Sequence, residues 1–286
     1  MNQDRHSQTA YRVALSRAAH QILDAPKVLD DPSALSIVGA EGATSIRKGG
    51  PQFNSGLGRR LRSGFVARNR FAEDELAEAI KRGARQYVIL GAGLDTFAYR
   101  NPYPSSQLRV FEVDHPSTQA WKLKQLDAAK IPIPSELKFV PVNFEAQTLA
   151  EQLRLAGFRT HEPTFFSWLG VTMYLTPELV MATLKDVASS TKGGGGIVFD
   201  FLTPFSQECF SRRLQLYIAS SLSNLLAPGE PWRAFFDANA LTQELKAIGF
   251  THVVDMRPDD INTRYFKNRT DKLGVQSPVH LMSARV

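Results

Sequence analysis

A glycine turn between two short apolar runs constrains this 286-residue chain more than any other feature. The first run, residues 86–90, leads into Gly91 and Gly93, and the second run ends in Asp114, twenty-one residues after Gly93. A strand, a glycine turn, a helix and a second strand tipped with a carboxylate form the first half of a nucleotide-binding crevice. Such a unit can bind NAD, FAD or S-adenosylmethionine, and the choice among them decides the function.

Short apolar segments alternate with amphipathic ones, which predicts a parallel sheet with crossover helices. Strands are expected at 86–90, 108–113, 137–142, 163–168, 196–201, 251–256 and 279–285. Helices are expected at 7–23, 64–81, 116–129, 145–156, 177–190 and 238–248. Residues 39–58 hold six glycines and few apolar side chains, so a loop is expected there. The predicted fold class is therefore α/β, with a doubly wound, mostly parallel seven-stranded sheet and an N-terminal helical cap.

One domain accounts for the whole pattern. Residues 1–82 are expected to form the helical cap, and residues 83–286 the α/β core that binds the cofactor. Residues 205–227 add a helical insertion to that core, which together with the cap could cover the mouth of the crevice.

The composition is that of a soluble globular enzyme, with 43% hydrophobic and 22% charged residues. The single cysteine, Cys209, cannot form an internal disulfide, which fits a reducing cytoplasm. No apolar stretch approaches the roughly 20 residues that span a bilayer, and the first residues lack the apolar core of a signal peptide. We therefore expect a cytoplasmic protein without a membrane partner.

The net charge of +6 comes from the first 70 residues, which hold 11 Lys and Arg against 5 Asp and Glu. Clustered arginines contact phosphate in nucleic-acid-binding arms. No recognition helix, zinc finger or RNA-binding motif accompanies them here, so a solvated helix face with one or two anion-binding arginines is the better interpretation. The charge favours an acidic small molecule over a basic one, and we expect no nucleic-acid partner.

The residues after the glycines discriminate between cofactors. A dehydrogenase turn carries a third glycine where this chain has Thr96. That turn binds a pyrophosphate, which a carboxylate would repel. Asp95 stands at that place. S-adenosylmethionine has no phosphate but carries an ammonium and a sulfonium, so Asp95 suits this ligand and disfavours NAD. Asp95 could also cap the following helix.

Two acids at the second strand compete for the ribose hydroxyls of the cofactor. Glu112 and Asp114 are two residues apart and so share one face of an extended strand. A ribose contact requires the carboxyl end of the strand, which favours Asp114. Glu112 could instead hold neighbouring segments together.

Two motifs together indicate a family. Residues 90–96 read Leu-Gly-Ala-Gly-Leu-Asp-Thr, and residues 111–116 read Phe-Glu-Val-Asp-His-Pro. Weaker matches lie at 8–10, 17–18, 31–32, 64–68, 166–168, 170–175 and 264–266. The pattern resembles the leucine carboxyl methyltransferase family of S-adenosylmethionine-dependent enzymes, which includes an enzyme that caps a protein phosphatase tail and a bacterial branch of O-methyltransferases.

The resemblance implies a role for each matching residue. Arg68 matches the arginine that binds the methionine carboxylate, and Gly91 and Gly93 match the turn beneath the methionine part. Asp114 matches the ribose-binding acid. Asn143 and Phe144 match the segment at the adenine edge, where the family normally has Asp in place of Asn143. The asparagine carbonyl can still accept a hydrogen bond, and a plain turn asparagine is the alternative.

Leu169 departs from the phosphatase-modifying branch, which has a glutamate at that position. A leucine would pack on the adenine or the cofactor backbone instead. This difference favours the bacterial branch, with a small acidic or phenolic acceptor rather than a protein tail.

The acceptor decides whether a catalytic base is needed. A carboxylate is already ionised at pH 7 and needs none, whereas a phenol would benefit from one. Tyr174, Arg264 and Tyr265 are weak catalytic candidates; the last two are expected in a polar loop, with packing roles as the alternative. His115 and His161 are placed where they could lie near the crevice, but structural roles are favoured for both. No side-chain grouping has metal-ligand spacing.

The sequence therefore predicts an S-adenosylmethionine-dependent O-methyltransferase that releases S-adenosylhomocysteine and acts on a carboxylate or hydroxyl of a small metabolite. An NAD-dependent oxidoreductase and a non-catalytic cofactor-binding module are the alternatives.

Overall fold

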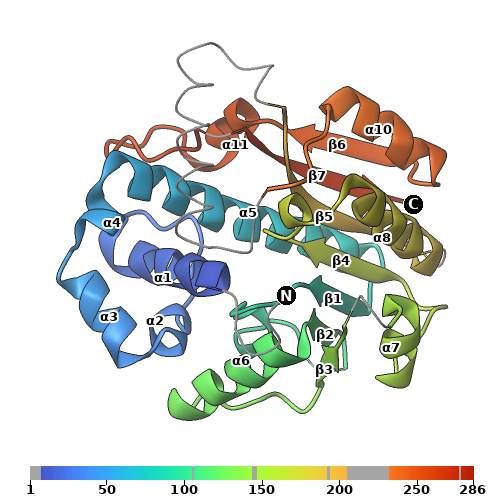
Figure 1. Ribbon diagram of the computed structural model, residues 1–286, viewed down its shortest axis with the longest axis horizontal. Coiled ribbons are helices and arrows are strands. Elements are labelled where there is room, and N and C mark those ends of the chain that lie inside the picture. Colours follow the sequence, from blue (N-terminus) through green and yellow to red (C-terminus); the bar gives the residue numbers. More distant parts are fainter. Residues whose placement is uncertain (1–7, 105, 144–146, 192–193, 205–231, 277) are drawn as a thin grey trace.

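The computed structural model describes residues 8–104, 106–143, 147–191, 194–204, 232–276 and 278–286. Its centre is a seven-stranded sheet in the order β3-β2-β1-β4-β5-β7-β6 (Figure 1). The strands are β1 (Gln86–Leu90), β2 (Arg109–Asp114), β3 (Leu137–Pro141), β4 (Thr164–Trp168), β5 (Gly195–Leu202), β6 (His252–Met256) and β7 (Val279–Arg285). The predicted fold class is confirmed, and each strand lies within two residues of its predicted bounds.

The direction of the strands creates the crevice. Strands β1 to β5 pair in parallel, and β7 runs antiparallel between β5 and β6. The chain order reverses at β1, which has β2 on one side and β4 on the other. In open α/β sheets, ligands bind outside the carboxyl ends of the strands at such a switch point. The glycine turn directly follows β1 at this point.

Helices from several parts of the chain cover both faces of the sheet. The helices of the described residues are α1 (Gln8–Leu23), α2 (Ala34–Ile37), α3 (Gly39–Arg47), α4 (Pro51–Asn54), α5 (Gly56–Lys81), α6 (Pro116–Ala128), α7 (Leu149–Leu155), α8 (Pro177–Ser190), α10 (Ala238–Ala247) and α11 (Pro258–Tyr265). Tyr87 and Ile89 of β1 join one core cluster with side chains of α5, whereas Val88 and Leu90 join a second cluster with side chains of α7, α8 and α10. Alternate strand residues therefore fill two separate cores, as expected for a sheet that is covered on both faces.

The expected loop at residues 39–58 is wrong, because helices α3 and α4 and the start of α5 occupy it. Ala43 and Ile46 of α3 are buried, and a side chain at Gly42 would lie 3.0 Å from Leu15 of α1. The glycine therefore permits a close contact between helices, and tertiary packing outweighs its poor helix propensity. Helix α5 also begins earlier than expected, where the side chain of Ser55 accepts a hydrogen bond from the Gly58 amide.

The helix expected directly after the glycine turn is also wrong. Only a single 3₁₀ turn, η1 (Phe97–Tyr99), separates the turn from β2 in the described residues. Pro102 and Pro104 follow it closely, and proline removes the amide that a continuing helix would need. The edge of the crevice is therefore shaped by turns and by helices from elsewhere in the chain.

We propose that the N-terminal helices form one cap in front of the core. Helix α1 packs on α5, α2 and α3, and α5 continues beneath the sheet to contact β4, β5 and β7. No helix among the described residues has the length and apolar character needed to cross a membrane. The predicted insertion at 205–227, together with Cys209, lies outside the described residues.

Candidate cofactor site

The turn after β1 has a backbone that only glycine adopts without strain. Gly91 and Gly93 have φ angles of 65° and 48°, in the left-handed region. A side chain at Gly91 would lie 2.4 Å from the Val171 side chain, so space also excludes one. Glycine is therefore required at this turn both by the backbone angles and by the close contact with Val171.

Asp114 ends β2 beside this turn. Its Oδ2 accepts a hydrogen bond from the Gly93 amide at 2.5 Å, and its Oδ1 accepts one from the His115 amide at 2.7 Å. Burial raises the pKa of Asp114, although these two amides act in the opposite direction. Each carboxylate oxygen keeps a second lone pair, so Asp114 lies where the prediction requires a ribose-binding acid.

Glu112 faces the protein interior. Its carboxylate lies 2.6 Å from the Lys122 ammonium of α6, and both side chains are almost fully buried. Burial raises the pKa of Glu112 to about 7, against the lowering effect of Lys122. These contacts agree with the alternative in which Glu112 holds neighbouring elements together.

Asp95 both caps η1 and faces two polar side chains of the cap. Its Oδ1 accepts a hydrogen bond from the Phe97 amide at 2.8 Å. Its Oδ2 accepts one from Asn69 of α5 at 3.1 Å and lies 3.6 Å from Arg17 of α1. The Asp95 side chain retains 14% exposure, so an incoming group can still reach it.

Asp95 belongs to a larger buried group of charges, which we call the glycine-turn cluster. Its members are Arg17, Asp31, Glu73, Asp95 and Arg100. Arg17 donates to the Leu94 carbonyl at 2.6 Å, and Asp31 accepts from the Thr96 hydroxyl at 2.6 Å. Arg100 pairs with Glu73 through two hydrogen bonds and lies 3.4 Å from Asp31.

Sequence reasoning did not assign Arg17, Asp31, Glu73 or Arg100 to the site. A signal was present for Arg17, which occupies the apolar stripe of α1 between Ala14 and Ala18. A charge at such a position is buried and must find a partner. The partners lie far away in the sequence, so only the fold identifies them.

Arg68 lies on α5 opposite the end of β5. Its Nη1 donates to Asp200 Oδ2 at 2.9 Å, and the Gly170 amide donates to Asp200 Oδ1 at 2.6 Å. Arg68 Nε is buried without a hydrogen-bond partner in the described part of the chain. Asp200 is fully buried, and the only sequence signal for it is a carboxylate inside the apolar strand β5.

The residues predicted near the adenine follow β3 and β4, between which β2 and β1 lie in the sheet. Asn143 comes after β3, is half-buried, and exchanges backbone and side-chain hydrogen bonds with Gln147. Leu169 comes after β4 and packs against the core cluster on the α5 side. Phe144 lies outside the described residues. The adenine contacts stay a prediction.

The three catalytic candidates differ in their surroundings. Tyr174 is half-buried at the end of η2 (Thr172–Tyr174), just beyond the carboxyl end of β4. Arg264 and Tyr265 lie in α11 and not in the expected loop. This helix starts at Pro258 with an acidic first turn. Both contact the Asp74 carboxylate of α5, at 3.1 Å and 2.8 Å. These contacts favour packing roles for Arg264 and Tyr265.

The two histidines near the ends of strands also have ordinary surroundings. His115 caps α6, and its Nδ1 lies 2.8 Å from the Ser117 hydroxyl. His161 is exposed before the amino end of β4, on the side of the sheet opposite the crevice. The described residues contain no group of acids, histidines and cysteines that could hold a metal ion.

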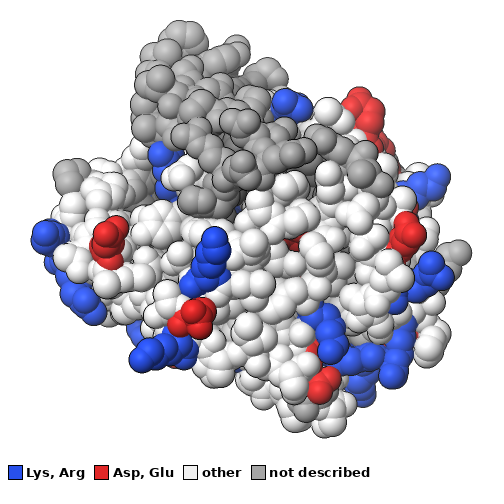
Figure 2. Space-filling view, turned by 60° about the horizontal axis from the view of Figure 1, so that its bottom comes forward, with Lys and Arg blue, Asp and Glu red and all other residues white. Residues whose placement is uncertain are grey.

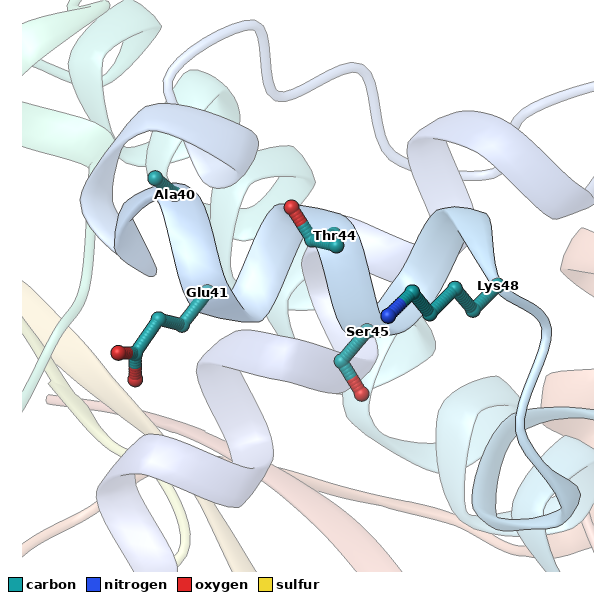
Figure 3. A pocket seen from close by; sticks show the side chains of 5 residues that line it. All are labelled: Ala40, Glu41, Thr44, Ser45 and Lys48. Atoms are coloured by element: carbon teal, nitrogen blue, oxygen red, sulfur yellow. The ribbon is translucent and has the colours of Figure 1, made fainter.

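A hollow on α3 lies apart from the predicted site residues. This shallow hollow, of about 440 Å³, lies along one face of α3 and contains none of the predicted site residues. Figure 3 shows the side chains that line it: Ala40, Glu41, Thr44, Ser45 and Lys48. On the face seen in Figure 2, lysines and arginines form separate groups with acidic side chains among them. The described residues on that face therefore present no continuous basic surface of the kind that binds nucleic acid.

Three observations test whether these residues fit S-adenosylmethionine. The glycine turn follows β1 at the carboxyl edge of the sheet, Asp114 lies beside it, and buried Arg68 Nε lacks a partner among the described residues. The glycine-turn cluster contains three carboxylates and two guanidiniums, so it is short of one positive charge. A ligand with two hydroxyls, a carboxylate and an ammonium would satisfy all of these groups.

Known proteins resemble this chain over most of its length. Residues 10–188 match the profile of the leucine carboxyl methyltransferase family. YktD of Bacillus subtilis (strain 168), whose name describes an S-adenosyl-L-methionine-dependent methyltransferase, is 33% identical over 99% of both chains. A Mycolicibacterium smegmatis protein with a similar name is 33% identical over 70% of this chain and 68% of its own.

Solved structures share the fold. A protein from Thermobifida fusca, described as a methyltransferase, superposes with a TM-score of 0.54 over 96% of this chain and 93% of its own, at 14% identity. A DUF574 family protein from Streptomyces avermitilis superposes with a TM-score of 0.51 over 99% and 98% of the two chains, at 15% identity.

Proposed function

Because the chain belongs to the leucine carboxyl methyltransferase family and is an S-adenosylmethionine-dependent methyltransferase, we propose that it methylates a carboxylate or hydroxyl oxygen of a small molecule with an apolar body. The family assignment decides against the NAD-dependent oxidoreductase. The oxygen acceptor and its size are the parts of this function that rest on the observations below.

The observation that carries the proposal is the exposed end of α5. This helix extends beyond the ends of the strands on the crevice side (Figure 1). Leu57, Leu61, Phe65 and Arg68 follow each other at helical spacing along one face. Leu57 and Leu61 are 50% and 47% exposed, and Phe65 packs against the Arg68 guanidinium at 4.9 Å. An apolar wall therefore leads from the surface to the cofactor site.

A small acid with an apolar body would suit this wall. Its hydrocarbon part would cover Leu57 and Leu61, removing apolar surface from water. Arg60 is exposed on the same stretch of α5 and would attract an anion. Leu169 supports a small acceptor further, because the phosphatase-modifying branch has a glutamate at that position.

The cofactor, when bound, supplies a methyl group on a positively charged sulfur. An acceptor oxygen attacks the methyl carbon from the side opposite the sulfur. The new bond is O–CH₃, the S–CH₃ bond breaks, and its electron pair stays on sulfur, which yields the neutral thioether S-adenosylhomocysteine. The protein contributes position: the oxygen must lie in line at roughly 3–3.5 Å from the methyl carbon. An ionised carboxylate needs no base for this step.

A screen with isotopically labelled methyl donor tests the proposal. Candidate acceptors are alkyl and aryl carboxylic acids, phenols, amines, and peptides that end in leucine. We expect labelled product from acids or phenols with an apolar body; a base-labile label identifies a methyl ester. Labelling only of leucine-terminated peptides, or only of nitrogen acceptors, would contradict the proposal.

A further inference from the structure

Helix α1 comes closer to the glycine turn than its distance in the sequence suggests. A side chain at Gly93 would lie 3.2 Å from the Ala10 methyl group. Two turns further along α1, the Arg17 side chain is only 4% exposed. Its Nη2 donates to the Leu94 carbonyl at 2.6 Å, and its Nη1 lies 3.6 Å from Asp95. Arg17 thus contacts both the backbone and the acid of the turn.

The charges around Arg17 are not balanced. Asp31, Glu73 and Asp95 carry three negative charges, against two positive charges on Arg17 and Arg100. Arg17 Nε and Arg100 Nε make no hydrogen bond within the described residues, but they lie 3.6 Å and 3.4 Å from the two carboxylate oxygens of Asp31 and are ion-paired with it. An uncompensated buried charge is costly. Asp95 is the member next to the turn, so a cation that binds there would balance the cluster.

From these contacts we propose that Arg17 is a positioning residue for the methionine part of the cofactor. Through the Leu94 carbonyl it fixes the backbone of the turn, and with Asn69 it orients Asp95 toward the α-ammonium. Docking of α1 and binding of the methionine part are then coupled, so that each stabilises the other. The proposal rests on the cofactor site described above and does not depend on the acceptor.

The cap also offers a matched control, which we call the Asp24 cluster. Arg62 of α5 donates to both oxygens of Asp24, at 2.7 Å and 2.8 Å, and to the Phe53 carbonyl at 2.6 Å. His20 Nδ1 lies 2.7 Å from Asp24, and His20 Nε2 accepts from the Val28 amide at 2.9 Å. Arg62 is about as buried as Arg17, but its partners Asp24 and Phe53 belong to the cap, whereas Arg17 contacts the glycine turn.

The experiment compares Arg17→Met with Arg62→Met by calorimetric titration of S-adenosylhomocysteine and by thermal unfolding with and without this ligand. Both substitutions are expected to lower the Tm. Arg17→Met should raise the Kd at least about tenfold, the effect of losing a charged hydrogen bond, and should lose most of the ligand-induced rise in Tm. Arg62→Met should change the Kd less than about threefold.

Adenosine supplies the second readout, because it lacks the methionine part. Arg17→Met should bind adenosine within about threefold of the wild-type protein, since the loss is confined to the methionine end. If Arg17→Met or Arg62→Met does not fold, Arg17→Lys and Arg62→Lys give the same comparison, because lysine keeps the charge but not the fork-shaped geometry. The proposal would be overturned if both variants lost affinity for S-adenosylhomocysteine equally. It would also be overturned if Arg17→Met lost affinity for adenosine and for S-adenosylhomocysteine equally.

Discussion

Two buried groups of charges hold the N-terminal cap together, and they differ in completeness. In the Asp24 cluster, Asp24 accepts hydrogen bonds from Arg62 and His20, and both partners make further hydrogen bonds to the backbone. One carboxylate faces one guanidinium. In the glycine-turn cluster, three carboxylates face two guanidiniums.

The difference separates a structural role from a binding role. A cluster that satisfies itself needs no ligand and can only stabilise the fold. A cluster that is short of one cation, next to the glycine turn, gains from a ligand that supplies the cation. Burial alone would not have told the two apart, because Arg17 and Arg62 are equally buried.

The largest effect is expected from breaking the complete cluster. Arg62→Met leaves the Asp24 carboxylate buried without its bidentate partner, and loss of one member of such a pair costs about 3–5 kcal/mol. Urea denaturation should show this loss in the free energy of unfolding. The control is Arg60→Met on the exposed side of α5, expected within about 0.5 kcal/mol. A loss below about 1 kcal/mol for Arg62→Met would show that the Asp24 cluster is not structural.

Gly91→Ala should damage the cofactor site through the backbone of the turn. The new methyl group would lie 2.4 Å from Val171 at a φ of 65°, so the turn must move. We expect the Kd for S-adenosylhomocysteine to rise by more than about tenfold, since the strain alone is on the order of 1–2 kcal/mol. Gly157→Ala is the control, because its φ of 88° is similarly strained but open space surrounds the new methyl group. If both variants bind alike, the turn does not contact the ligand.

Asp114→Ala should remove the ribose contact. We expect the Kd for S-adenosylhomocysteine to rise tenfold or more, about 1.4 kcal/mol. Glu112→Gln is expected to change this Kd by less than about threefold, because Glu112 faces Lys122 inside the protein. Titration calorimetry of both variants shows which of the two acids contacts the ligand. The reverse order of effects would mean that the wrong acid has been assigned to the ribose.

The smallest effect concerns pH. Burial raises the pKa of Asp24, but the hydrogen bonds from His20 and Arg62 outweigh this effect and lower the pKa to about 2. Since the ordinary value is 3.8, the unfolded chain takes up a proton before the native protein does. The stabilisation by Asp24 is thus complete above about pH 4 and is lost as the pH falls toward 2. Denaturation at pH 6 and pH 3 should show that the stability advantage over Asp24→Asn shrinks; an advantage that grows on acidification would contradict the assignment.

The sequence was sufficient for features that depend on local pattern. Apolar runs located all seven strands, and Gly91, Gly93 and Asp114 were recognised by their spacing. Helix α3 was missed because Gly42 marks a tight helix contact, which looks like a loop signal in the sequence. Helix α11 was missed although Pro258 and two acids mark its first turn.

The buried partners could not have been found in the same way. Arg17 lies 77 residues from Leu94, and Arg68 lies 132 residues from Asp200. Local spacing carries no information about such pairs. The prediction that Arg68 binds a carboxylate did not include Asp200, which holds one side of the guanidinium and leaves Nε without a partner among the described residues.

A crystal structure with S-adenosylhomocysteine bound tests the central claim most directly, because it locates the α-ammonium. We expect this ammonium within about 3 Å of an Asp95 carboxylate oxygen, with Arg17 still bound to the Leu94 carbonyl and Asp114 on the ribose hydroxyls. An ammonium that binds away from Asp95, with the glycine-turn cluster unchanged and uncontacted, would contradict it.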